Sequence, residues 1–176
     1  EEKEWTRVCD EERIADKKIV TGVEAATNEG KLTVRGIQDE PGVAAEILSV
    51  LADDGINVDM IVQNISDDRK TTDLTCTVPS DESIRAKELM EGLSSNLSYK
   101  DLIVDTNISK ISIVGVGMRS NAGVASQMFR VLSENNINID VISTSEIKIS
   151  VLINKDLTEK ALNTLHDHFE LGNISN

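Results

Sequence analysis

The chain contains two copies of one sequence pattern, and this repeat constrains its fold more than any other feature. A shift of 81 positions aligns residues 42–61 with residues 123–142, and nine of the twenty pairs are identical. Chance alone would give about one identity, so the pattern indicates a duplicated structural unit. Each copy can therefore be interpreted with the help of the other.

Both copies show the same order of predicted elements. Alternating apolar residues predict strands, and apolar residues at helical spacing predict helices that end at Asp54-Gly55 or Asn135-Asn136. The second helix of each copy begins at the capping residues Ser80 or Asp81, and Asn154. The order in each copy is strand, helix, strand, strand and helix. The predicted strands span residues 31–37, 57–65 and 71–78 in copy one, and 110–116, 138–143 and 147–153 in copy two. The first helix carries apolar residues between positions 43 and 51, or 124 and 132, and the second extends to Leu93 or Phe169.

This order predicts an α+β fold of two ferredoxin-like βαββαβ modules. Copy one is completed by a strand at residues 101–106, whereas copy two ends before a sixth element. The remaining stretch with strand character is residues 18–25, so we expect it to supply the missing strand. The first module, residues 28–107, is thus predicted to be inserted in the second, residues 17–27 plus 108–172. Residues 1–16 are predicted to be a linker or tail.

Composition excludes several classes of function. The 18 Lys and Arg residues against 31 Asp and Glu residues give a formal charge of −13, and aromatic residues make up 2% of the chain. Such a protein repels phosphate and offers few rings for base stacking, which excludes nucleic-acid binding. No apolar run is long enough for a membrane span and the first residues do not form a signal peptide, so we expect a cytoplasmic location.

No motif predicts catalysis, a metal or a cofactor. Cys9 and Cys76 stand alone, and His166 and His168, two residues apart, would not face each other on a helix. There is no glycine-rich phosphate loop with a lysine and no nucleophile–histidine spacing. We therefore expect neither metal nor cofactor, and no enzymatic activity of this chain alone.

The turn between the first strand and the first helix is the candidate binding element of copy one. The free NH groups of residues 42–44 would bind a carboxylate, and Asp39 could hold an ammonium group. The second strand is predicted to carry polar side chains on one face, at Asn57, Asp59 and Gln63. Together these groups would bind both ends of a free amino acid. The alternative interpretation is a simple helix cap beside a solvated strand.

Copy two offers a related site with different chemistry. Its turn, residues 118–123, is two residues longer, lacks the proline, and has Ser120 and Asn121 in place of the acidic residue. The NH groups of residues 123–125 recur, and the polar residues opposite are Asn138, Asp140, Thr144, Ser145 and Glu146. The two sites therefore need not bind the same ligand.

Four runs of residues resemble a known family. Residues 32–42, with Asp39-Glu40-Pro41-Gly42, and residues 56–64 resemble the first ACT domain of an aspartate kinase. Residues 113–118 and 137–151 are similar to the second, and the last run is the most specific motif of the chain. The resemblance implies a regulatory tandem of ACT domains that binds threonine, lysine or both and inhibits the phosphorylation of aspartate.

The resemblance also implies two effector sites. The first would comprise Asp39, Pro41, Gly42, Val43, Ala44, Asn57, Val58, Asp59, Gln63, Asn64 and Ser66. The second would comprise Met118, Arg119, Ser120, Asn121, Gly123, Val124, Ala125, Asn138, Ile139, Asp140, Thr144, Ser145 and Glu146. Implied partners are a second copy of the chain, paired through the ACT domains with effector between them, and the catalytic domain or alpha subunit of an aspartate kinase.

Two other classes of function remain open at this point. One is a tandem ACT sensor of another amino-acid pathway, such as the small subunit of acetolactate synthase or a glycine-responsive regulator, which a screen of all amino acids would reveal. The other is a small ferredoxin-like enzyme, such as an acyl-phosphate hydrolase, that would use Arg119 and Asn121 at a phosphate-binding turn. A hydrolysis assay tests the latter.

Overall fold

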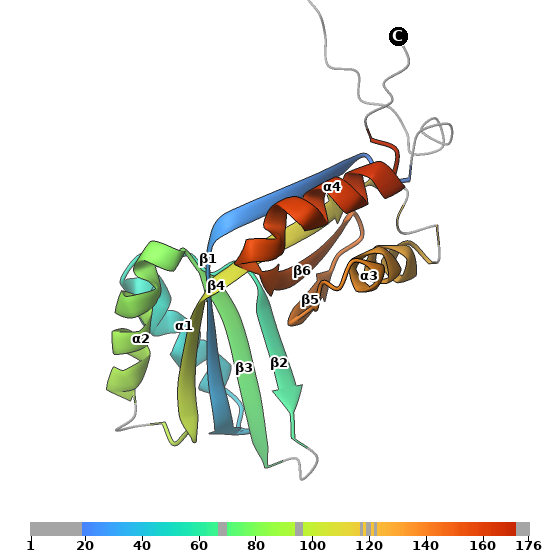
Figure 1. Ribbon diagram of the computed structural model, residues 1–176. Coiled ribbons are helices and arrows are strands. Elements are labelled where there is room, and N and C mark those ends of the chain that lie inside the picture. The colour runs from blue at the N-terminus through green and yellow to red at the C-terminus, as the bar shows by residue number, and fades with distance from the viewer. Residues whose placement is uncertain are drawn as a thin grey trace, which may run out of the picture.

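Two long antiparallel strands form the axis of the computed structural model, which describes residues 19–66, 70–93, 97–116, 118, 121 and 123–171. They are β1 (Gly22–Gln38) and β4 (Asp101–Val114), and they run side by side through the whole molecule (Figure 1). The other elements are α1 (Val43–Asp53), β2 (Ile61–Ile65), β3 (Thr71–Val78), α2 (Ser83–Gly92), α3 (Val124–Glu134), β5 (Val141–Thr144), β6 (Lys148–Asn154) and α4 (Thr158–His168). The six strands form one antiparallel sheet in the order β2-β3-β1-β4-β6-β5.

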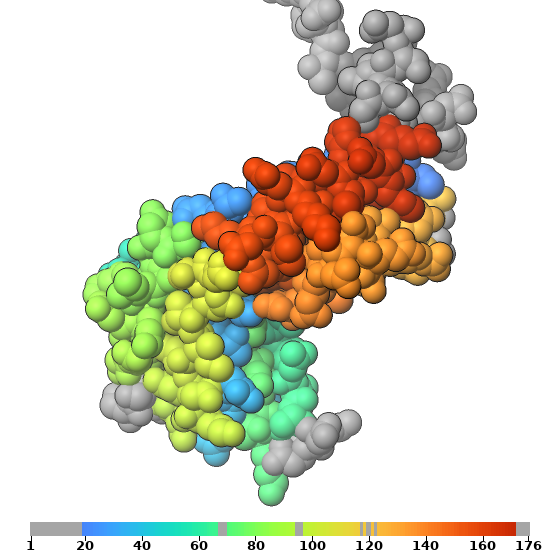
Figure 2. Space-filling view, viewed as in Figure 1, coloured from blue at the N-terminus to red at the C-terminus, as the bar shows by residue number. Residues whose placement is uncertain are grey.

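Each half of this sheet forms a lobe with its own hydrophobic core. Lobe 1 consists of β2, β3, the second half of β1 and the first half of β4, covered by α1 and α2 around Leu32, Leu51 and Leu74. Lobe 2 consists of the remaining strand segments with α3 and α4, packed around Ile111 and Leu132. In Figure 2 the green and cyan atoms of lobe 1 and the orange and red atoms of lobe 2 lie in different parts of the molecule. No helix in the described part of the chain is long and apolar enough to cross a membrane.

Two β-bulges in the middle of β1 and β4 allow one sheet to serve both lobes. Ala26 pairs with Lys110, Glu29 with Ile108 and Lys31 with Asp105, so each strand carries one extra residue between these pairs. An extra residue moves the side chains that follow to the opposite face of a strand. The helix-facing residues of β1 are therefore odd-numbered before the bulges, at Val23 and Ala25, and even-numbered just after them, at Leu32 and Val34. The helices of both lobes thus cover the same face of the sheet. Both strands bend in this region (Figure 1).

The predicted fold class is confirmed, including the insertion of one module in the other. The stretch expected to supply the missing strand forms the first part of β1, where residues 22–26 pair with residues 110–114 of β4. The strands predicted separately at 18–25 and 31–37 are one continuous strand, as are those at 101–106 and 110–116. The exact domain boundaries stay a prediction, because neither strand is interrupted there. The predicted tail, residues 1–16, lies outside the described residues.

The two edge strands are shorter than predicted. The strand expected over residues 57–65 begins only at Ile61, and that expected over 138–143 is Val141–Thr144. Residues 57–60 and 138–140 connect a helix to an edge strand as irregular backbone. In the first loop the NH of Asp59 donates to the carbonyl of Thr77, and the NH of Thr77 donates to the carbonyl of Met60, both at 3.0 Å. In the second loop the NH of Asp140 donates to the carbonyl of Leu152 at 2.9 Å.

A first stability prediction concerns Gly115, where the chain after β4 passes the segment before β1. A Cβ atom at this position would lie 1.9 Å from the carbonyl oxygen of Ile19, and backbone atoms cannot rotate away. We expect Gly115→Ala to lower the free energy of unfolding by about 1–3 kcal/mol, measured by urea denaturation. Gly22→Ala is the control, because nothing lies within 4 Å of the added Cβ. Equal stability of the two variants would contradict the close contact.

Candidate functional site

The predicted effector residues of lobe 1 lie at opposite ends of α1. The turn at residues 39–42 precedes the helix, and Gly42 has the left-handed φ of 101° that favours glycine. Residues 57–59 follow the other end of the helix. A helix of 11 residues is about 16 Å long. One small ligand therefore cannot contact both the turn and Asn57 of the same chain.

Lobe 2 shows the same separation. Gly123, with φ of 103°, precedes α3, and Asn138 and Ile139 follow the other end of this helix of 11 residues. Met118 is buried in the core of lobe 2, so the expectation that it contacts an effector is not matched by its position. Asn121 is half-buried, and Arg119 and Ser120 lie outside the described residues.

Each lobe carries a groove between the end of its first helix and the start of its edge strand. The groove of lobe 1 has a volume of about 360 Å³ and is lined by Leu48, Ala52, Gly55, Ile56, Asn57, Val58 and Ile61. The groove of lobe 2 has a volume of about 460 Å³ and is lined by Phe129, Ser133, Asn136, Ile137, Asn138 and Ile139. Every lining residue of the second groove is related by the shift of 81 positions to one in the first. The repeat thus builds two equivalent grooves, both containing predicted effector residues.

The chemistry of the grooves suits the uncharged part of a small polar ligand. Asn57 and Asn138 each offer an amide donor and acceptor beside apolar side chains. Neither set of lining residues, all within the described part of the chain, includes a charged side chain. The charged ends of an amino acid would therefore need groups from outside the groove.

Both grooves open at an edge of the sheet. On their outer sides, β2 and β5 have no neighbouring strand among the described residues. Ile61 on β2 is 49% exposed and Ile142, at the equivalent position on β5, is 46% exposed. Unpaired strand edges beside exposed apolar side chains are typical of surfaces that contact another chain.

Asp59 and Asp140, both predicted to bind effector, form ion pairs with lysines of the opposite lobe. Asp59 contacts Nζ of Lys110, a residue in the lobe 2 half of β4. Oδ2 of Asp140 lies 2.9 Å from Nζ of Lys31, a residue in the lobe 1 half of β1. Each carboxylate is paired with its lysine through Oδ2.

Lys110 stays charged although its side chain is largely buried. Burial, the largest single influence, lowers its pKa, but the hydrogen bonds and charges of Asp59 and Glu29 together outweigh burial and raise the pKa. Oε1 of Glu29 lies 2.5 Å from Nζ of Lys110. The lysine is therefore a permanent cation at neutral pH, held between two carboxylates.

Gln63 and Asp59 do not share a strand face, so that part of the sequence interpretation is wrong. Alternation does not extend back to Asp59, because β2 begins at Ile61. Gln63 pairs with Leu74 and so points to the helix-covered side. Asp59 contacts Lys110. Ile111, the next residue of β4, packs against the helices, so Lys110 and its partner Asp59 lie on the opposite side of the sheet.

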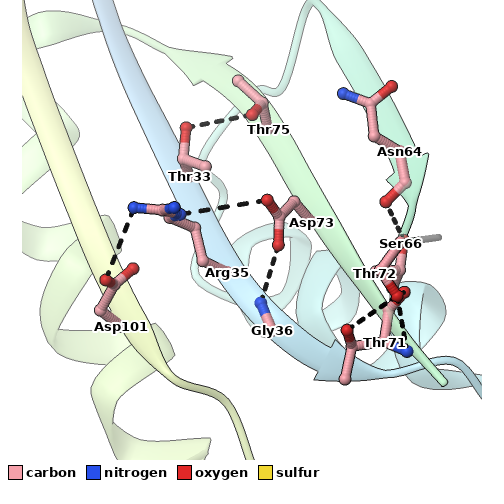
Figure 3. Close-up of polar contacts among 10 residues, drawn as sticks. All are labelled: Thr33, Arg35, Gly36, Asn64, Ser66, Thr71, Thr72, Asp73, Thr75 and Asp101. Atoms are coloured by element: carbon pink, nitrogen blue, oxygen red, sulfur yellow. Dashed lines mark hydrogen bonds and ion pairs between the residues drawn. The ribbon is translucent and has the colours of Figure 1, made fainter. Parts of the chain in front are cut away.

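The remaining predicted residues lie on the two edge hairpins. The carbonyl of Asn64 accepts a hydrogen bond of 2.9 Å from Oγ1 of Thr72, and Ser66 bonds to Thr71 across the same hairpin (Figure 3). Thr144 ends β5, and the NH of Ser145 donates to the carbonyl of Lys148 at 2.7 Å. Glu146 lies in the same turn. These contacts shape the hairpins and lie apart from the two grooves.

Lys31 and Lys110 are not among the residues predicted from the sequence. A signal for them existed, because each is the first residue of the aligned strand segments 31–37 and 110–116. A lysine at the same position of both copies, followed by alternating apolar residues, indicates a shared role for its charge.

Comparisons with known proteins match this architecture. A family model described as ACT domain matches residues 32–91 and again residues 111–169. An aspartokinase from Pseudomonas aeruginosa is 48% identical over 164 residues, which are 93% of this chain and 40% of that protein. The chain thus spans about two fifths of the length of the curated relatives it matches.

Two solved structures resemble the chain over nearly their full length. The regulatory subunit of aspartate kinase from Thermus thermophilus, in a ligand-free form, is 36% identical with a TM-score of 0.80. A chain in a structure of aspartokinase alpha and beta subunits is 43% identical with a TM-score of 0.81. Each match covers 86% of this chain and 99% of the other.

Proposed function

The chain belongs to the ACT-domain family and is the regulatory part of an aspartokinase, and on this premise we propose that it binds threonine, lysine or both as feedback inhibitors. The bound effector lowers the rate at which the associated catalytic domain or subunit phosphorylates aspartate. The observation that carries the proposal is the pair of equivalent grooves, each containing an asparagine and an apolar residue from the predicted effector sites.

The effector site is completed by a second chain. A groove supplies an amide and apolar surface, whereas Asp39 and the NH groups of Gly42 and Ala44 that would bind the charged ends lie at the other end of α1. The NH of Val43, predicted to be free, donates to the carbonyl of Glu40 at 3.4 Å. A lobe of a second chain, packed antiparallel beside the first, places its own turn over the groove. The open edges at β2 and β5 and the exposed Ile61 and Ile142 provide the contact surface. The proposed assembly is a homodimer with effector bound between the lobes.

Inhibition follows from linkage. An effector that contacts both chains binds one dimer arrangement more tightly than others and increases its population. The catalytic part is less active in that arrangement. A coupling free energy of roughly 1–3 kcal/mol between effector binding and the kinase equilibrium is sufficient for a useful feedback response.

Calorimetric titration of the chain with threonine and with lysine, with molar mass measured by light scattering, tests the proposal. We expect saturable binding of at least one of the two and a larger dimer fraction in its presence. A coupled assay of the assembled kinase should show lower activity at the same effector concentrations. Absence of binding by both would contradict the choice of effector, and titration with the other amino acids then tests a sensor of a different pathway.

A further inference from the structure

Two lysines on the central strands each hold the loop that borders the groove of the opposite lobe. Lys110 contacts Glu29 of β1 and Asp59, and Lys31 contacts Asp105 of β4 and Asp140. We call these two three-residue groups the lysine clamps. In each clamp one carboxylate comes from the neighbouring central strand and the other from the loop before an edge strand of the other lobe. Asp59 and Asp140 are equivalent under the shift of 81 positions, and Lys31 and Lys110 begin equivalent strand segments. These two members of each clamp are therefore related by the repeat.

The clamps connect directly to the groove linings. Asp59 follows Val58, and Asp140 follows Ile139, and both of these apolar residues line a groove. The loops that carry them are irregular backbone between helix and strand, so ladder hydrogen bonds do not fix them along their whole length. A charge pair at Asp59 or Asp140 therefore limits the positions that the groove-lining residues next to it adopt.

We propose that each lysine is a positioning residue for the effector groove of the other lobe, so that Lys110 shapes the groove of lobe 1 and Lys31 shapes the groove of lobe 2. The inference goes beyond effector binding, because it makes the groove of each lobe depend on a side chain of the other lobe. Both lysines lie on β1 or β4, and these two strands pair with each other beside both clamps. The effector arm of the inference, which concerns the affinity of a groove for its ligand, rests on the proposed function. The structural arm, which concerns how firmly the two loops are held, does not.

A matched control lies on the same strand as Lys31. Arg35 of β1 also sits between two carboxylates, with Nε 4.0 Å from Asp73 and a terminal guanidinium nitrogen 3.8 Å from Asp101 (Figure 3). Both of these partners belong to lobe 1. Replacing Arg35 thus removes a similar cation without removing a contact between lobes.

Hydrogen–deuterium exchange of the full chain tests the structural arm with the variants Lys110→Met, Lys31→Met and Arg35→Met. The NH groups of Asp59 and Asp140 are hydrogen-bonded and report on the two loops. We expect Lys110→Met to raise exchange in residues 57–61 by about three- to tenfold and to leave residues 138–142 unchanged. Lys31→Met should do the reverse, and Arg35→Met should change neither. If Lys110→Met folds poorly because Glu29 is left unpaired, Asp59→Asn removes the loop contact alone and should give the same local result.

The crossed pattern decides the inference. Three results would overturn it. They are faster exchange only in the loop of the lobe that carries the substituted lysine, faster exchange in both loops with every variant, and unchanged exchange in both loops. Titration with threonine and lysine adds the effector arm: in a Ser133→Phe background, where the groove of lobe 2 is filled, Lys110→Met should weaken binding by about three- to tenfold and Lys31→Met should not. If the wild-type chain binds neither amino acid, the proposed function fails, while the exchange pattern still decides whether the clamps act across the lobes.

Discussion

Ala52→Phe is expected to weaken effector binding at the groove of lobe 1 by about 100-fold or more, which corresponds to roughly 3 kcal/mol. Ala52 lines this groove and is exposed on α1, so a phenyl ring fills the space that a ligand would occupy. The fold should tolerate the change, because the new side chain displaces no core residue. Calorimetric titration with threonine and lysine measures the loss, and Ser133→Phe is the equivalent change in lobe 2.

Ser49→Phe provides the control for this experiment. Ser49 is also exposed on α1 but does not line the groove. Wild-type affinity in Ser49→Phe together with loss in Ala52→Phe would place the effector in the groove. Wild-type binding by a double variant with both grooves filled would contradict the site assignment, and equal loss in Ser49→Phe would point to damage of the whole helix surface.

The fold was predictable because the repeat supplies the same pattern twice. The short apolar run before the first module is a weak strand signal by itself. It can be assigned as a strand because copy two lacks one strand that copy one has. The extent of β1 and β4 could not be predicted this way. Bulges at residues 26–31 and 105–110 depend on pairing between distant segments, and the polar residues there, such as Asn28 and Asn107, interrupt the alternation that identifies a strand.

The candidate site was predictable in its residue types but not in its geometry. Asn57 and Asn138 were found because the Ile-Asn-x-Asp run repeats, and they do line the grooves. The aspartates of the same run also form ion pairs, and their lysine partners lie 51 and 109 residues away in the chain. Sequence spacing carries no information about which residues form such distant pairs. An aspartate that pairs with a lysine therefore cannot be distinguished in the sequence from one that is open to a ligand.

The two shared strands lead to a prediction about how the protein unfolds. Leu51 and Leu132, equivalent and fully buried, lie at the centres of the two cores. We expect Leu51→Ala and Leu132→Ala each to lower the free energy of unfolding by about 2–5 kcal/mol, since each leaves a cavity. Scanning calorimetry and urea denaturation measure the change. Ile84→Ala is the control: Ile84 is 74% exposed on α2, and its loss should change stability by about 0.5 kcal/mol or less.

The form of the transition matters as much as its midpoint. β1 has 17 residues and β4 has 14, and each contributes to both cores, so unfolding of lobe 1 releases one end of two of the four strands of lobe 2. We therefore expect one cooperative transition in the wild type and in both leucine variants, because two strands of each lobe continue without interruption into the other lobe. Two separate transitions in Leu51→Ala, with lobe 2 still protected from hydrogen exchange, would show that the lobes are independent domains. A single transition would mean that a change in the packing of one lobe is felt by the strands of the other, which is the mechanical basis that communication between two effector grooves requires.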